Sequence, residues 1–217
     1  MRVFLGVTGA SGAPYAKRLL DALVGAGCEV GLCASAAGVE VLATELYGDA
    51  ALSRDDVLGR FVGGAGSSVR VYGTDDWSSP YASGSARVDA YVICPCSMST
   101  VGTLSSGAMS NLIHRAASVA LKERRKLVLV PRETPLSAIH LRGLATLNDA
   151  GAVILFAAPG FYHAPATVDD LVDFVVARCL DQLGVENTLV RRWGVGLTEP
   201  QMSGGAGSAG AGAGDGQ

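Results

Sequence analysis

The sequence predicts a three-layer α/β fold in which a doubly wound parallel sheet lies between two sets of helices. Short apolar segments alternate with segments of helical periodicity along most of the chain, and this alternation is typical of parallel βαβ units. The first apolar segment runs into a glycine-rich turn and then a helix, as open α/β sheets commonly begin. A chain of 217 residues with 49% hydrophobic residues is long enough for one such domain with a sizeable core.

The regular elements follow from the period of the apolar positions. The predicted strands are Val3–Val7, Glu29–Ala34, Ala90–Cys94, Leu127–Val130 and Val153–Ala157. The predicted helices are Ala13–Ala26, Ala36–Leu46, Ile113–Arg124, Ser137–Ala150 and Thr167–Leu183. Thr167 and Asp170 have the spacing of a capping box at the beginning of the last helix, whose Leu171, Phe174, Val175 and Leu183 are expected to face the core.

Two segments fall outside this alternation. Residues 48–85 show no clean period, so we expect an irregular excursion with a short edge strand at Val69–Tyr72. Residues 203–217 are almost entirely Gly, Ala and Ser, and they cannot bury enough apolar surface to offset the entropy of ordering. We therefore expect one domain over residues 1–195 and a flexible tail at residues 203–217.

The overall charge argues against a nucleic-acid partner. The formal net charge is −3 and the isoelectric point is about 5.6, whereas binding a phosphate backbone requires a basic face. A mean hydropathy of +0.33 is high for a soluble monomer and predicts apolar subunit contacts. Met1 and Arg2 lead directly into a strand, and Gly and Pro interrupt the longest apolar segment at residues 150–168. We therefore expect a cytoplasmic protein with no signal peptide and no membrane partner.

The cysteines and histidines predict no metal site. The five cysteines are odd in number and have neither zinc nor disulfide spacing, so buried reduced thiols are expected. His114, His140 and His163 show no paired spacing of metal ligands, and we interpret each as a hydrogen-bonded structural residue.

The glycine-rich turn contains Gly6, Gly9 and Gly12. Its backbone N–H groups and the positive end of the following helix form a place where a ligand phosphate can sit. Ser35 rather than an acidic residue follows the second strand, which disfavours NAD, and no P-loop motif occurs. The plain alternative is that any tight strand-to-helix turn favours glycine.

Polar residues follow the later strands. The third predicted strand is expected to stop at Pro95, and Ser97 and Thr100 then stand at a helix entrance, where they either cap the helix or hold a phosphate. Basic residues recur at helical spacing between residues 115 and 125, for which a solvated helix face is the default interpretation.

Two loops bracketed by prolines also follow strands. The first carries Arg132 and Glu133, and a carboxylate beside a guanidinium suits proton handling next to a bound phosphate. The second carries Tyr162 and His163, whose default interpretation is an amphipathic cover over the core.

Taken together, these motifs resemble those of the UbiX/Pad1 flavin prenyltransferases. The matching segments run from Met1 to about Trp193, interrupted only in the middle excursion, and are G-A-S-G at Gly9–Gly12, P-C-S-M-S-T at Pro95–Thr100, N-L-I-H-R-A-A at Asn111–Ala117, L-K-E-R-R at Leu121–Arg125, R-E-T-P-L at Arg132–Leu136, H-L-R at His140–Arg142, F-Y-H at Phe161–His163 and L-D-Q-L at Leu180–Leu183. The first motif alone is not specific, but the ordered series is. The resemblance implies a Rossmann- or flavodoxin-like fold of the HFCD flavoprotein type.

The resemblance also implies a reaction, which is the transfer of a dimethylallyl group from dimethylallyl phosphate to reduced FMN. The product would be prenylated FMN for a UbiD-type decarboxylase. Residues that match the family's FMN ligands are Gly9, Ala10, Ser11, Ser35, Ser97, Met98, Ser99, Thr100 and Arg115. Residues that match its dimethylallyl phosphate ligands are Lys122, Arg132, Glu133, Tyr162 and Arg178.

The candidate catalytic residues carry distinct implied roles. Glu133 is the candidate for proton transfer, with Ser11 and Glu45 as relay members, and Trp193 is the candidate aromatic wall beside the allyl group. Lys122, Arg132 and Arg178 would stabilise the charge that develops on the leaving phosphate.

One departure and two alternatives accompany this interpretation. Ser99 stands where the family commonly has Lys, which removes one charge near FMN. The family forms dodecamers with sites at subunit junctions, so a homododecamer is expected. The alternatives are an FMN-dependent cysteine decarboxylase of the same fold and a non-catalytic flavin carrier.

Overall fold

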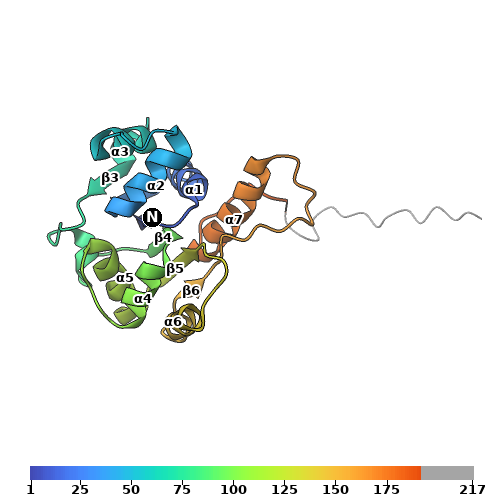
Figure 1. Cartoon of the computed structure of the whole chain (residues 1–217). Coiled ribbons are helices and arrows are strands. Elements are labelled where there is room, and N and C mark those ends of the chain that lie inside the picture. Colours follow the sequence, from blue (N-terminus) through green and yellow to red (C-terminus); the bar gives the residue numbers. More distant parts are fainter. Residues whose placement is uncertain (192–217) are drawn as a thin grey trace, which may run out of the picture.

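A computed structural model describes residues 1–191 of the chain, so Trp193 and residues 203–217 lie outside the described residues. Parallel strands form one sheet in the order β3-β2-β1-β4-β5-β6 (Figure 1). The strands are β1 (Arg2–Val7), β2 (Glu29–Ala34), β3 (Val69–Tyr72), β4 (Ala90–Cys96), β5 (Lys126–Pro131) and β6 (Val153–Ile154). The direction of winding reverses between β1 and β4, and sheets of this kind bind ligands outside the carboxyl ends of the strands at that point.

Helices cover both faces of the sheet, which confirms the predicted three layers (Figure 1). One face packs against α1 (Ala13–Gly25), α2 (Ala36–Tyr47), α3 (Arg54–Val62) and α7 (Val168–Leu183). The other face packs against α4 (Met98–Ser105), α5 (Leu112–Lys122) and α6 (Ala138–Asp149). Because side chains alternate along a strand, Val3 and Leu5 join the first core and Phe4 joins the second.

A glycine of β2 makes room for an aromatic side chain. Tyr81 lies in the short 3-10 turn η2 (Pro80–Ala82), and a Cβ atom at Gly31 would lie 2.1 Å from its ring. The Tyr81 ring also contacts the rings of Phe4 and Tyr72, at centroid distances of 5.1 and 5.5 Å. This ring contact fixes the end of the middle segment to the sheet.

The middle segment, residues 48–85, is more regular than the sequence indicates. The predicted edge strand at Val69–Tyr72 is confirmed and pairs with β2, and a further 3-10 turn, η1 (Gly66–Ser68), precedes it. The helix α3 is not predicted. The Ser53 hydroxyl caps it by accepting a hydrogen bond from the Asp56 N–H, and three of its apolar side chains are buried. A helix of nine residues beside glycines is too short for its apolar period to stand out.

Strand β4 continues through the proline at which it is predicted to stop. The Cys94–Pro95 peptide is cis, and the pairing of β4 with β5 shifts in register between Ile93 and Cys96. An irregular strand position accommodates the missing N–H of a proline. The Pro95 carbonyl accepts a hydrogen bond from the Thr8 N–H at 3.1 Å, so the end of β4 stays attached to the end of β1.

The remaining elements lie close to their predicted bounds, except that β6 ends at Ile154 rather than Ala157. The N–H groups of Leu155 and Ala157 nevertheless donate to carbonyls of β5 at 2.8 and 3.0 Å. The capping box of Thr167 and Asp170 is confirmed at the beginning of α7.

All five cysteines are buried and free, which confirms the predicted thiols. Across residues 1–191, no helix is long and apolar enough to cross a lipid bilayer. Asp169, Asp170 and Asp173 have the D-D-x-x-D spacing of a magnesium cluster, although the sequence is expected to contain no such cluster. Asp170 instead caps α7, and Asp173 forms an ion pair with Arg18 at 2.5 Å. Among the described residues, no group of three His, Cys, Asp or Glu side chains could hold a metal ion.

Candidate functional site

Three polar turns meet at the carboxyl ends of β1, β2 and β4, where the winding of the sheet reverses. We call them together the cradle, which comprises residues 8–12, Ser35 and residues 97–100. Every residue expected to bind FMN lies in the cradle, with the exception of Arg115. The sheet topology therefore brings together residues that are far apart in the sequence.

The first turn of the cradle packs closely against the beginning of α2. A Cβ atom at Gly9 would lie 2.5 Å from the Cβ of Ala37, so a side chain at Gly9 would push the turn away from that helix. Gly12 has a φ of 135°, a conformation that L-residues rarely adopt. Glycine at both positions keeps the surface of this turn as bare backbone.

The beginning of α1 is occupied by a carboxylate of the same chain. The N–H groups of Gly12 and Ala13 donate to Oε2 of Glu45, at 2.9 and 2.8 Å. The sequence predicts a ligand phosphate at this helix end, and that phosphate would have to displace the Glu45 carboxylate to reach these two N–H groups. The anion-binding capacity of the cradle therefore lies at the beginnings of α2 and α4, which follow Ser35 and Ser97.

Glu45 joins the cradle to the loop after β5. Burial acts to raise the pKa of Glu45, but hydrogen bonds from the Ser11 hydroxyl and from two backbone N–H groups, together with the charge of Arg132, lower the pKa below its usual value. The Arg132 Nε donates to the Ser11 carbonyl at 3.3 Å. The structure thus places Ser11, Glu45 and Arg132 together, with Glu45 ionised at neutral pH.

Ser35 and Ser97 act as N-caps. The Ser35 Oγ accepts a hydrogen bond from the Gly38 N–H at 3.0 Å, and the Ser97 Oγ accepts one from the Thr100 N–H at 3.3 Å. The capping alternative is therefore confirmed for Ser97, whereas Thr100 supplies the capped N–H and its hydroxyl lies 3.1 Å from the Ser97 hydroxyl. A capping hydroxyl still has its own proton to donate, so phosphate binding at the same residues stays a prediction.

Thr8 is a residue of the cradle that the sequence analysis does not single out. Its hydroxyl donates to the Pro95 carbonyl at 3.0 Å and accepts from the Ser97 N–H at 2.8 Å. These bonds hold the turn after β4 against the turn after β1. A polar residue at the buried end of an otherwise apolar strand is the sequence signal that could have found it.

Glu133 and Arg115 lie outside the cradle, on the loop after β5 and on α5. Glu133 follows the carboxyl end of β5, and its Oε1 accepts a hydrogen bond from the Thr134 N–H at 3.1 Å. Arg115 lies in the first half of α5, and its Nε donates to the Ala82 carbonyl at 2.9 Å. Both side chains are thus anchored by backbone groups of nearby loops.

Lys122 lies at the other edge of the sheet. It ends α5, four residues before the amino end of β5, whereas Arg132 follows the carboxyl end of that strand. At roughly 3.3 Å per residue, β5 separates the two levels by about 16 Å. Lys122 forms an ion pair with Glu123, and both side chains are partly exposed. One chain therefore does not bring Lys122 to the cradle.

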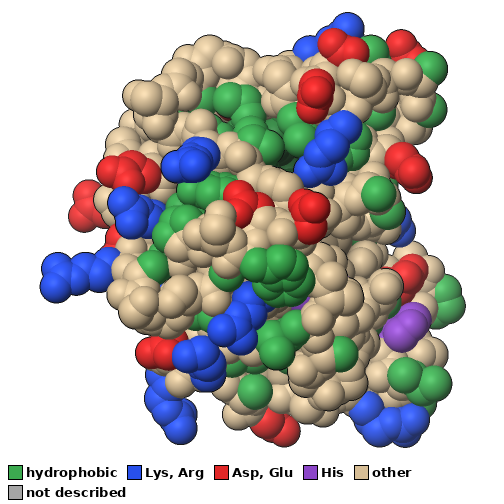
Figure 2. Space-filling model, turned by 90° about the vertical axis from the view of Figure 1, so that its left-hand side faces the viewer, with side chains coloured by type: hydrophobic (Ala, Val, Ile, Leu, Met, Phe, Trp, Pro, Cys, Tyr) green, Lys and Arg blue, Asp and Glu red, His purple; other side chains and the backbone are tan. Residues whose placement is uncertain are grey.

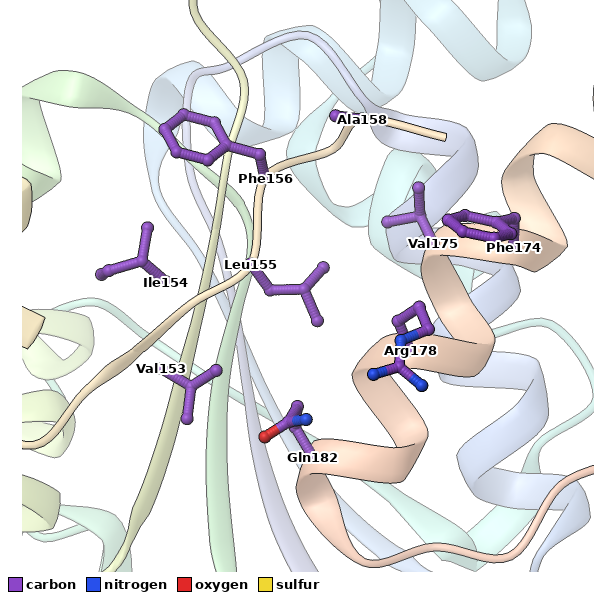
Figure 3. A pocket seen from close by; sticks show the side chains of 9 residues that line it. All are labelled: Val153, Ile154, Leu155, Phe156, Ala158, Phe174, Val175, Arg178 and Gln182. Carbon is purple, nitrogen blue, oxygen red and sulfur yellow. The ribbon is translucent and has the colours of Figure 1, made fainter. Parts of the chain in front are cut away.

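Arg178 lies on α7 beside β6 (Figure 3), and Tyr162 lies in the loop that joins these two elements. Arg178 borders a cavity of about 260 Å³ and forms an ion pair with Asp181 at 2.9 Å. The residues lining this cavity are Val153, Ile154, Leu155, Phe156, Ala158, Phe174, Val175, Arg178 and Gln182. The Tyr162 ring lies edge-on to Phe174, with a centroid distance of 5.6 Å.

The three histidines differ in their contacts. His114 shares a hydrogen bond of 3.0 Å with the Ser110 hydroxyl, and burial lowers its pKa. His140 completes the capping box of α6. Neither ring nitrogen of His163 has a hydrogen-bond partner within residues 1–191, so the expectation of a hydrogen-bonded structural residue is wrong for this one. Its ring stacks on Phe174 at 5.2 Å instead.

The face of the molecule on the side of β3 and α5 has no large patch of purely positive or purely negative side chains. Figure 2 shows basic and acidic side chains interspersed with apolar ones across this face. Such a surface suits small anionic ligands and apolar contacts better than a polyanion.

Comparisons with known proteins relate this chain to flavoproteins. The model of the family described as Flavoprotein matches residues 1–180. The flavin prenyltransferase UbiX of Pseudomonas aeruginosa is 52% identical over 198 residues, which cover 89% of this chain and 94% of that protein.

Solved structures agree with this match. A crystal structure of AnUbiX (PadA1) in complex with FMN and dimethylallyl pyrophosphate is 38% identical, with a TM-score of 0.77 over 88% of this chain and 96% of that one. A dodecameric FMN-dependent UbiX-like decarboxylase from Escherichia coli O157:H7 is 40% identical, with a TM-score of 0.78 over 89% of this chain and 99% of that one.

Proposed function

Because the chain belongs to the Flavoprotein family and, within it, to the UbiX flavin prenyltransferases, we propose that it transfers a dimethylallyl group from dimethylallyl monophosphate to reduced FMN. Prenylated FMN is the product, and a UbiD-type decarboxylase is the proposed recipient. The observation that carries the proposal is that Ser11 of the cradle lies together with Glu45 and Arg132.

The cradle fits FMN. Gly9 lets the first turn pack against the beginning of α2, since a side chain there would collide with Ala37, and this packing holds the turn beside Ser35. The hydroxyls of Ser35 and Ser97 stand at two helix beginnings, which favour an anionic phosphate group. Met98, Ser99, Thr100 and Arg115 complete the proposed set. Reduced FMN, when bound, supplies the nucleophilic ring atoms that the allyl group joins.

The donor needs cations, because breaking its carbon–oxygen bond leaves negative charge on the departing phosphate. Lys122, Arg132 and Arg178 are the proposed cations, and Tyr162 donates a further hydrogen bond. Glu133 is the proposed proton carrier, since it neighbours Arg132 on the loop after β5. Ser11 and Glu45 form the relay beside it, and the aromatic wall beside the allyl group is assigned to Trp193.

The proposed donor site requires more than one copy of the chain. Lys122 and Arg132 lie at opposite edges of the sheet in one chain, so a neighbouring copy must supply one of them to a shared site. Ile139, Phe161 and Tyr162 are 72%, 70% and 63% exposed, and such apolar surfaces suit subunit contacts. We therefore infer a homododecamer, which a monomer by light scattering would contradict. A cytoplasmic location is supported by the five buried free thiols.

The test is an anaerobic reaction of the purified protein with reduced FMN and either dimethylallyl monophosphate or diphosphate. Mass spectrometry should detect a flavin heavier by one prenyl unit, formed faster from the monophosphate. An unchanged flavin mass with both donors would refute the enzyme assignment. Faster reaction with the diphosphate would overturn the choice of donor but not the transfer.

The role of Glu133 has its own variant. Glu133→Gln keeps the size and polarity of the side chain but cannot carry a proton, so the prenylated product should disappear while FMN still binds. Full activity of this variant would remove Glu133 from its proposed role.

A further inference from the structure

A buried hydroxyl joins two of the three turns of the cradle. Thr8 directly follows β1 and is only 3% exposed. Its Oγ1 donates to the Pro95 carbonyl at 3.0 Å and accepts from the Ser97 N–H at 2.8 Å. The Thr8 N–H donates to the same carbonyl at 3.1 Å. One residue therefore makes three hydrogen bonds between the carboxyl ends of β1 and β4, where the winding of the sheet reverses.

The end of β4 depends on these bonds because its own pairing is irregular there. Regular pairing of β1 with β4 ends at Gly6 and Ile93, and the register of β4 against β5 shifts beyond Ile93. Pro95 has no N–H to donate. A Cβ atom at Gly12 would lie 3.3 Å from the Cβ of Pro95, so the two turns also approach each other closely. The bonds of Thr8 thus hold the two strand ends together beyond the last regular pair.

Ser97 passes this attachment on to α4. Its Oγ accepts a hydrogen bond from the Thr100 N–H at 3.3 Å and lies 3.1 Å from the Thr100 hydroxyl. Thr8 holds the backbone of Ser97, and Ser97 caps the helix, so the first turn of α4 is positioned from the end of β1. The N–H groups of a first helical turn are the ones left free for a ligand, and their direction follows the cap.

We propose that Thr8 is a positioning residue for FMN, whose buried hydroxyl sets the place of the first turn of α4 relative to the turn after β1. This inference rests on one part of the proposed function, which is that residues 97–100 bind FMN. A hydroxyl has one proton, and Thr8 has given its proton to Pro95, so Thr8 does not donate to the FMN phosphate. Its effect on FMN passes through Ser97.

The test measures the dissociation constant of oxidised FMN by quenching of flavin fluorescence. Thr8→Val keeps the branched shape of the side chain but leaves the Ser97 N–H without its acceptor, so the constant should rise about tenfold. Thr8→Ser keeps the hydroxyl and should bind FMN within about threefold of the wild type. Thr146→Val is the matched control, since it removes a hydroxyl that donates to the Arg142 carbonyl at 2.9 Å within α6, and it should leave the constant unchanged.

Hydrogen exchange distinguishes positioning from general stabilisation. The backbone N–H groups of residues 97–100 should exchange faster in Thr8→Val than in the wild type, while β5 keeps its protection, and Thr8→Ser should restore the slow exchange. Faster exchange in both places, a lower melting temperature with an unchanged FMN constant, or equal weakening in Thr8→Ser and Thr8→Val would each overturn the inference. If Thr8→Val does not fold, Thr8→Cys replaces it, because a thiol is a weak donor and acceptor and should give an intermediate rise.

Failure of the proposed function would look different, because FMN binding is measured without the prenyl donor. A tenfold effect of Thr8→Val in a protein that never forms prenylated flavin would refute the transfer and leave the role of Thr8 intact. Normal transfer by the wild type with an unchanged FMN constant in Thr8→Val would refute the role of Thr8 alone. A wild-type protein that binds no FMN would refute both.

Discussion

In the cradle, the candidate residues are held by hydrogen bonds and close contacts within one chain, whereas on the donor side they stand on separate surfaces. We use the term donor side for residues 131–133 together with Lys122, Tyr162 and Arg178. Ser11 and Glu45 share a hydrogen bond, and Ser97 is fixed to Thr8. Lys122, by contrast, is paired with its neighbour Glu123 at the far edge of the sheet.

The difference shows what a single chain can build by itself. The cradle consists of backbone and short side chains at the ends of adjacent strands, so the sheet forms it when the chain folds. The donor side uses long cationic side chains, which lie largely in solvent until something brings them together. We expect the cradle to be complete in one subunit and the donor side to be complete only in the assembly.

The largest loss of activity should come from removing the cation at either edge of the sheet. Lys122→Ala and Arg132→Ala each remove a cation that stabilises the leaving phosphate, and each should lower kcat/KM by about 100-fold or more. If the two residues of one site come from different chains, oligomers that contain both variants should regain part of the activity. Co-expression with two affinity tags and an assay of the doubly purified oligomers would measure this.

Oligomers that carry two tags on the same variant are the control and should stay inactive. Mixed oligomers with no more activity than this control would contradict a site shared between chains. That result would also mean that the donor side, like the cradle, is complete within one subunit.

The next effect is confined to the cradle. Gly9→Ala places a Cβ atom 2.5 Å from that of Ala37, so the turn after β1 must move away from α2. We expect the FMN dissociation constant to rise by about 10- to 100-fold, while KM for the donor at saturating FMN stays unchanged. Quenching of flavin fluorescence measures the first constant. Gly59→Ala serves as the matched control, and an unchanged dissociation constant for Gly9→Ala would argue that the cradle yields easily.

The same contrast explains what could be predicted from the sequence. The layers and most of the helices and strands follow from local apolar periods, and the cradle follows from residues such as Ser35 and Ser97 that come directly after strands. The occupation of the α1 beginning by Glu45 could not be predicted, because it depends on how α2 packs beside the first turn. The distance between Lys122 and Arg132 requires knowing that α5 runs back to the amino edge of the sheet.

A smaller effect concerns the ionisation of Glu45. Its pKa in the folded protein is lower than the ordinary value of 4.5, so its contribution to stability is complete above that value and is lost as the pH falls through the lowered pKa. Glu45→Gln should reduce the free energy of unfolding by about 1 kcal/mol at neutral pH, since the carboxylate is partly screened by solvent. The difference between variant and wild type should shrink as the pH falls below 4.5.

Urea unfolding of both proteins at a series of pH values would measure this difference. Glu40→Gln, on the exposed side of the same helix, should change the free energy of unfolding by less than about 0.5 kcal/mol. A difference for Glu45→Gln that grows toward acid pH would mean that the carboxylate is not held in its charged form.

The smallest effect concerns the connection between the two regions. Arg18 on α1 donates to both carboxylate oxygens of Asp173 on α7, at 2.5 and 3.1 Å, and Asp173 directly precedes Phe174. Both side chains are partly exposed, so Arg18→Met and Asp173→Asn should each lower the free energy of unfolding by about 0.5–1 kcal/mol. The double variant should lose less than the sum, because each single change already breaks the pair. A strictly additive loss would show that the pair contributes nothing, and that the helix beginning at the cradle and the helix carrying Arg178 are joined by apolar packing alone.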